Sequence, residues 1–81
     1  MDEIIVVLSS ITSANRVKYY LKNMYNEQAV VMQVPKVLQT AGCGYCIKTK
    51  NKNIELVFEA VKKLDIKTKG VFDAVSYKKI R

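Results

Sequence analysis

Two cysteines, Cys43 and Cys46, carry the most distinctive chemistry in the chain. They lie three positions apart in the run Gly42-Cys43-Gly44-Tyr45-Cys46. The chain has no histidine, which excludes a Cys-His nucleophile pair, a histidine general base and a histidine metal ligand. Any chemistry performed by this protein is therefore expected to involve one of these thiols.

Cys43 has the sequence environment of a reactive thiol. It lies between Gly42 and Gly44, which give little steric cover and suit a loop better than a core. Main-chain N–H groups around the glycines, together with Lys36 or Lys48, could favour its thiolate form. We predict that Cys43 is the functional thiol and that Gly42, Gly44, Cys46, Lys36 and Lys48 support it.

Cys46 lies in an alternating pattern typical of a strand, where a small apolar residue packs well. A structural role is therefore expected for it. Two alternatives stay open: Cys43 and Cys46 could cycle between dithiol and disulfide, or they could bind a metal. A structural zinc site needs four ligands, so a dimer would have to supply the second pair. We expect no cofactor, and a metal only if this alternative holds.

Length and composition indicate one small folded domain spanning residues 1–81, because 49% of the residues are hydrophobic and 26% are charged. No stretch approaches the roughly 20 apolar residues of a membrane helix. The start of the chain also lacks the basic and long apolar segments of a secretory signal. We therefore expect a cytoplasmic protein without membrane contact, in which a permanent disulfide would be unusual.

The net charge of +7 lies entirely after Pro35, since three basic and three acidic residues balance before it. A basic half could attract nucleic acid, an acidic protein or a small anion, or it could lower the pKa of a nearby thiol. RNA binding is a third alternative, in which Tyr45 and Tyr77 would stack on bases. It is less favoured than the thiol functions, because no Lys/Arg-Gly-Phe/Tyr signature is present.

The periodicity of apolar residues predicts four strands and two helices along the chain. They are a strand over 4–8, a helix over 12–25, a strand over 28–34, a strand over 45–50, a helix over 53–64 and, after Gly70, a strand over 71–77. A loop over 35–44 joins the second and third strands. This βαββαβ order predicts an α+β, ferredoxin-like fold, with both helices on one face of a four-stranded antiparallel sheet. The other face would be open to a partner or to a second copy in a homodimer.

The chain resembles a family of small proteins described as selenium/sulfur carrier-like (DUF3343). The resemblance is carried by the first strand ending in Leu8-Ser9-Ser10, by Pro35-Lys36 with Leu38, and by Cys43-Gly44 entering a strand with a basic residue at Lys48. It implies that Cys43 accepts sulfane sulfur or selenium as a persulfide or perselenide and passes it on. The partners would be a donor protein and an acceptor protein, and the chain would be a carrier rather than an enzyme.

Overall fold

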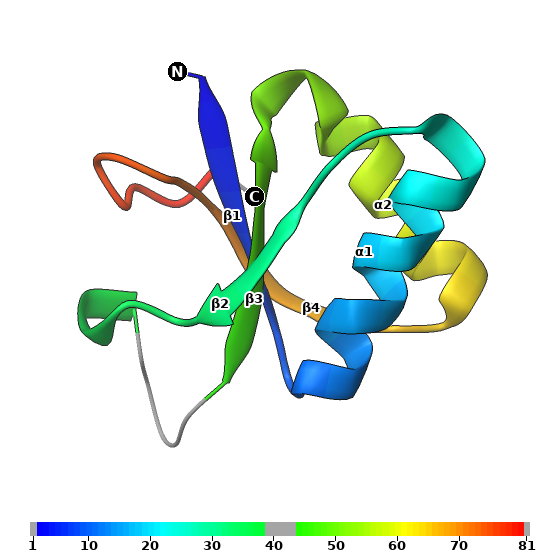
Figure 1. Cartoon of the computed structure of the whole chain (residues 1–81). Helices are drawn as coiled ribbons and strands as arrows, with labels where there is room; N and C mark the ends of the chain where they lie inside the picture. The colour runs from blue at the N-terminus through cyan, green and yellow to red at the C-terminus, as the bar shows by residue number, and fades with distance from the viewer. Residues whose placement is uncertain (1, 39–43, 81) are drawn as a thin grey trace.

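The computed structural model of the chain describes residues 2–38 and 44–80. Within these ranges, two α-helices lie on one face of a four-stranded sheet (Figure 1). The elements follow the order β1 (Glu3–Leu8), α1 (Ile11–Tyr25), β2 (Val30–Gln33), the 3₁₀ turn η1 (Lys36–Leu38), β3 (Tyr45–Lys50), the 3₁₀ turn η2 (Asn51–Asn53), α2 (Ile54–Leu64) and β4 (Thr68–Asp73).

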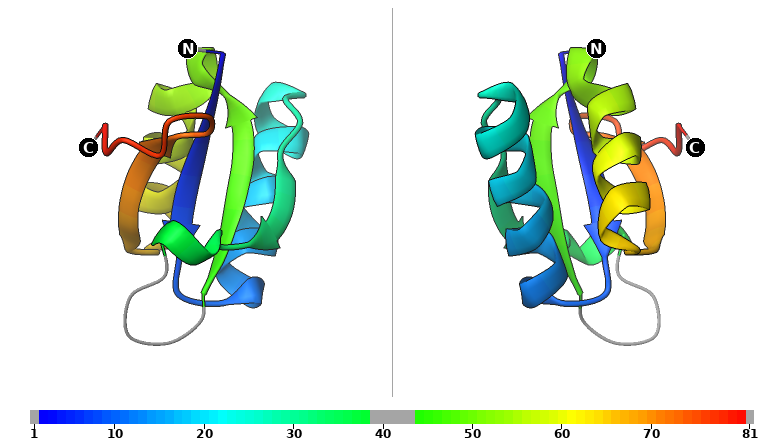
Figure 2. Two further views of the ribbon diagram at one scale, coloured as in Figure 1. Left: turned by 90° about the vertical axis from the view of Figure 1, so that its left-hand side faces the viewer. Right: turned by 90° about the vertical axis from the view of Figure 1, so that its right-hand side faces the viewer.

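The sheet has the strand order β2-β3-β1-β4, and every neighbouring pair is antiparallel. Both helices cover the same face, and two views at right angles to the first show the sheet and helices as two layers (Figure 2). This strand order, with the βαββαβ sequence of elements, is the ferredoxin-like arrangement. The predicted fold class is therefore confirmed.

Strand β1 lies at the centre of the sheet because its residues are apolar on both faces. Ile4, Val6 and Leu8 point into the core beneath the helices, whereas Ile5 and Val7 point to the opposite face. All five side chains are buried. A strand covered on both faces is expected to be continuously hydrophobic, as β1 is.

Helix α1 begins where a side chain can satisfy its first turn. The Ser10 hydroxyl accepts a hydrogen bond from the Ser13 N–H at 3.1 Å, so Ser10 is the N-cap. The helix ends at Asn26, which has the left-handed conformation with φ 55° that commonly terminates helices. Between these ends the helix buries Ala14, Val17 and Leu21 against the sheet.

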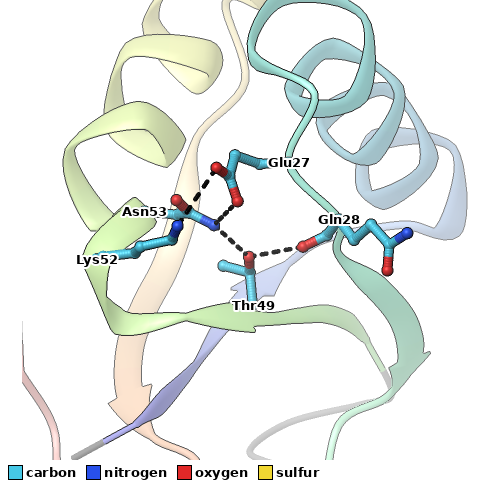
Figure 3. Close-up of polar contacts among 5 residues, drawn as sticks. All are labelled: Glu27, Gln28, Thr49, Lys52 and Asn53. Carbon is cyan, nitrogen blue, oxygen red and sulfur yellow. Dashed lines mark hydrogen bonds and ion pairs between the residues drawn. The ribbon is translucent and has the colours of Figure 1, made fainter.

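A polar network links the C-terminal end of β3 to the connection between α1 and β2 (Figure 3). The buried Thr49 hydroxyl donates to the Gln28 carbonyl oxygen at 2.8 Å. The buried Asn53 amide donates to Thr49 Oγ1 at 3.0 Å and to Glu27 Oε1 at 3.2 Å. Lys52 Nζ lies 3.6 Å from Glu27 Oε2. These bonds fix the start of α2 relative to the sheet.

The face of the sheet away from the helices differs from the predicted open surface. Ile5, Val7, Val34 and Cys46 form a second buried cluster there. Met32, Leu38, Phe72 and Ala74 pack against it, and η1 crosses this face (Figure 2). The expectation of an open face was wrong because the apolar residues after β2 fold back over the sheet.

Two predicted strands also differ from the structure by two or more residues at an end. Strand β4 spans Thr68–Asp73 instead of 71–77. Gly70 lies inside this strand, with φ 135°, beside the register shift at Val7 and Leu8, and does not precede the strand. Strand β2 is shorter than predicted, and a 3₁₀ turn, η1, lies within the predicted loop.

The chain after β4 turns back along the outer edge of that strand. Asp73 begins the turn by accepting a hydrogen bond from the Ser76 hydroxyl at 2.8 Å. Lys79 then pairs with Phe72, and the Ile80 N–H donates to the Val71 carbonyl oxygen at 2.7 Å. The outer edge of β4 is thus covered by the chain itself from Val71 to Asp73.

Candidate functional site

The predicted site residues Gly42 and Cys43 lie outside the residues that the structure describes. Gly44, to which Cys43 is bonded, is described. The Val34 N–H donates to the Gly44 carbonyl oxygen at 3.2 Å, which extends the pairing between β2 and β3 by one step. Gly44 therefore lies at the end of the sheet where β1 and β2 end and β3 begins.

Close packing explains why residue 44 is a glycine. A Cβ atom at this position would lie 3.0 Å from the Leu8 carbonyl oxygen and 3.7 Å from Val34 Cγ2. The first distance is tighter than an ordinary van der Waals contact, and the neighbour is main chain, which cannot rotate away. Gly44 thus allows β3 to begin directly against the end of β1.

The N-terminus of α1 lies at this same end of the sheet, because only Ser9 and Ser10 separate Leu8 from the helix. The first N–H groups of a helix lack partners within the helix, and the helix dipole places a partial positive charge there. The first turn of α1 contains no acidic residue to neutralise that charge. An anion beside Gly44 would therefore experience a favourable field.

Cys46 lies in the second buried cluster and has no exposed surface. It stands opposite Val7 on β1 and Met32 on β2, and its Sγ lies 3.8 Å from the Gln33 carbonyl oxygen, to which the thiol donates. Burial raises the pKa of the Cys46 thiol to about 11, although the charge of Lys48 lowers it in part. The thiol is therefore protonated and shielded at neutral pH.

The two predicted supporting lysines occupy different places. Lys36 is exposed and opens η1, two residues after Val34, whose N–H is bonded to Gly44. Lys48 is partly buried on β3, on the same side of the sheet as Cys46. Lys48 follows Gly44 by four residues, which correspond to about 13 Å along a strand, so Lys48 lies far from the end of the sheet that holds Gly44. The structure brings Lys36, but not Lys48, to the end of the sheet near Gly44.

The structure gives little support to the metal-binding and RNA-binding alternatives. Across residues 2–38 and 44–80, no group of three or more His, Cys, Asp or Glu side chains is placed to hold a metal ion. Tyr45 packs against the core beneath the helices, so it is not on the face where bases would stack on a sheet of this fold. None of the helices in the described part of the chain is long and apolar enough to cross a membrane.

The start of α1 is a part of this site that sequence reasoning did not identify. Ser9 and Ser10 were noted at the end of the first strand without a role in the site. The signal was present in the topology, because β1 and β3 are antiparallel neighbours in a ferredoxin-like sheet. The residues that follow β1 must therefore lie beside those that precede β3.

Comparison with known proteins identifies a family for the chain. No curated protein and no solved structure matches the chain. A family model with the description "Putative Se/S carrier protein-like" matches residues 3–73, which include Cys43, Gly44 and the start of α1. Since the match covers most of the 81 residues, the chain belongs to the Se/S carrier protein-like family.

Proposed function

We propose that the protein carries sulfur or selenium on Cys43 as a persulfide or perselenide. The observation that carries this proposal is the burial of Cys46, which lies at the centre of an apolar cluster and has a raised pKa. A carrier of the matched family needs a thiol that a donor can reach. With Cys46 shielded, Cys43 is the remaining cysteine in the chain.

The transfer is a displacement at the terminal sulfur of a donor persulfide. The Cys43 thiolate attacks that sulfur, the bond between it and the donor cysteine breaks, and the donor cysteine leaves as a thiolate. The product on the carrier is Cys43–S–SH, and the sulfane sulfur keeps its oxidation state. An acceptor nucleophile then takes the terminal sulfur and releases the Cys43 thiolate. A selenium atom in place of the terminal sulfur would be transferred by the same exchange of bonds.

The end of the sheet around Gly44 supports this chemistry through its charge. Transfer requires a thiolate, and a helix N-terminus or a nearby lysine lowers the pKa of a thiol. The α1 N-terminus follows β1 at the end of the sheet that holds Gly44, and Lys36 lies two residues after Val34, whose N–H is bonded to Gly44. Both features favour an anion at this end of the sheet without a histidine base.

Cycling of Cys43 and Cys46 between dithiol and disulfide is less well supported. Such cycling requires the second thiol to act as a nucleophile, and nucleophilic attack uses the thiolate. With a pKa of about 11, Cys46 forms little thiolate near pH 7. It also packs without exposed surface between two neighbouring strands.

The test is the intact mass of the reduced protein after incubation with a cysteine desulfurase and cysteine. We expect the wild type and Cys46→Ala to gain one or more sulfur atoms, and Cys43→Ser to gain none. The gain should be reversed by a thiol reductant, because a persulfide is reducible. The proposal is wrong if Cys43→Ser still loads while Cys46→Ala does not, or if folded wild-type protein with free thiols never loads.

A further inference from the structure

The two outer strands of the sheet differ in whether their free edge is covered. On β4, the returning residues Lys79 and Ile80 bond to Phe72 and Val71. On β2, no strand lies along the outer side among residues 2–38 and 44–80. Figure 2 shows β2 at the margin of the sheet, on the same side of the molecule as α1. An uncovered edge strand presents main-chain groups with which another segment can pair.

The main chain of β2 offers such groups in a regular pattern. Val34 and Gly44 form a hydrogen-bonded pair with β3, and these pairs alternate along an antiparallel ladder. The alternation directs the N–H groups of Val31 and Gln33 away from β3. Residues 28–35 carry no charged side chain, so the edge lacks the lysines and acids that often prevent strand pairing.

A groove with two lysines in its wall lies between α1 and the start of β2. It has a volume of about 350 Å³, and its walls include Lys18, Tyr19 and Lys22 of α1, Val30 of β2 and Glu27 from the connection between them. Tyr19 and Val30 are 58% and 56% exposed, which is high for large apolar side chains. Glu27 already pairs with Lys52 Nζ at 3.6 Å and accepts a hydrogen bond from the Asn53 amide at 3.2 Å, and α1 itself carries no acid, so the two lysines remain available to a partner's carboxylates.

We propose that β2 binds an extended, acidic segment of a partner protein, which adds to the sheet as a fifth strand. Main-chain bonds to Val31 and Gln33 would hold the segment, since strand addition takes its affinity from such bonds. Alternate side chains of the added strand would point into the groove, where carboxylates can pair with Lys18 and Lys22. This inference goes beyond sulfur carriage and does not depend on it.

A second copy of the chain fits this edge less well. Pairing of two β2 strands would bring two α1 helices together on one face of the joined sheet. Each helix carries Arg16, Lys18 and Lys22 without an acid, and each chain has a net charge of +7. Like charges facing one another oppose association, whereas an acidic segment relieves the repulsion.

The test uses two blocked decapeptides, one alternating valine with glutamate and one alternating valine with lysine. Each is added to the ¹⁵N-labelled full chain while the amide resonances are followed. We expect the glutamate peptide to shift the amides of β2 and α1 and to slow hydrogen exchange at Val31 and Gln33. The lysine peptide should bind about tenfold more weakly, because its charges oppose Lys18 and Lys22.

Two pairs of variants separate main-chain pairing from charge. Gln33→Pro removes an outward N–H without removing a bond to β3, whereas Gln33→Ala keeps that N–H. Charge reversal at Lys18 and Lys22 is matched by the same reversal at the exposed Lys62 and Lys63 of α2. We expect Gln33→Pro to weaken binding of the glutamate peptide about tenfold, and the charge reversal at Lys18 and Lys22 to weaken it by a similar factor. Both control variants should bind it as the wild type does.

Three results would overturn the proposal. One is that neither peptide perturbs β2 at millimolar concentration, and another is that both peptides bind equally. The third is concentration-dependent dimerisation through β2 in sedimentation experiments, which would make a second copy the occupant. Because Cys43→Ser leaves β2 intact, peptide binding by that variant tests the edge separately from sulfur loading.

Discussion

At the scale of single residues, the environment of Cys46 explains why two neighbouring cysteines are not equivalent. Its thiol lies among Val7, Val34 and Met32, so ionisation would place a charge in apolar surroundings. Desolvation of the charged form is the largest cause of its raised pKa, and Lys48 compensates for only part of it. The sulfur therefore acts as a small hydrophobic group.

This raised pKa predicts an alkaline loss of stability. The folded chain holds the Cys46 proton up to about pH 11, while a thiol in the unfolded chain releases it near its ordinary value of 9.0. The stabilisation that the protonated Cys46 thiol gives to the folded chain is therefore complete below pH 9 and is lost as the pH rises through 11. Between pH 8 and 11, we expect the unfolding free energy of wild type to fall about 2 kcal/mol further than that of Cys46→Ala.

Urea denaturation of the reduced proteins at a series of pH values measures this difference. Cys46→Ala is a suitable reference because it removes the titrating thiol and leaves Cys43, the lysines and the tyrosines in place. Parallel curves for the two proteins would show that Cys46 ionises as easily in the folded chain as in the unfolded one.

At the scale of elements, α1 begins at the end of the sheet that holds Gly44. Its N-terminus follows β1 directly, and Ser10 caps it. We expect Thr12→Glu to strengthen the helix slightly, because an acid in the first turn interacts well with the dipole. The same carboxylate should raise the pKa of Cys43 and slow its alkylation by iodoacetamide severalfold at pH 7.

The matched control is Thr12→Gln, which has the same shape without the charge. Rates are obtained from intact mass over time, with Cys46→Ala as the background so that one cysteine reacts. If the glutamate and glutamine variants react at the same rate across the pH range, the α1 N-terminus does not act on the Cys43 thiol.

The helices and strands also show how much of the fold could be predicted from the sequence. The apolar run of β1 and the helical stripes of α1 and α2 predicted their own positions, because burial on one or both faces leaves a regular pattern. Gly70 was misread as the residue before a strand, since its role depends on a register shift against β1 that is invisible in sequence. Pairing of Lys79 with Phe72 was missed for the same reason, as it joins residues across a turn.

The candidate site was predictable only in part. The roles of Cys43 and Lys36 were inferred from residue type and stay predictions, whereas the position of Gly44 against Leu8 agrees with a demand for glycine there. The buried environment of Cys46 followed from its strand pattern. The approach of the α1 N-terminus required the strand order, and the separation of Lys48 from Gly44 required its register.

At the scale of the whole molecule, stability and the proposed chemistry lie at opposite ends of the sheet. The network of Thr49 and Asn53 closes one end, and Gly44 and the start of α1 form the other. Figure 3 shows that the network joins the end of β3 to the residues before β2. A defect in the network is therefore expected to weaken the fold without altering the opposite end.

We expect Asn53→Ala to lower the free energy of unfolding by about 1–3 kcal/mol, because the buried Thr49 hydroxyl and the partly buried Glu27 carboxylate lose their hydrogen-bond partner. Sulfur loading at a temperature where the variant is folded should equal that of wild type. Chemical denaturation and intact mass measure the two effects. A stable variant, or one that is folded but does not load, would contradict this separation.

The returning chain at β4 has a consequence for assembly size. A sheet with two uncovered edges can grow without limit, since each added molecule offers a new edge to the next. Here, the returning chain covers β4 at Val71 and Phe72, so β2 is the edge strand without such cover in the described part of the chain. Two copies that paired through β2 would each use up that edge, so self-association of this kind would stop at a dimer and would not elongate into a fibre.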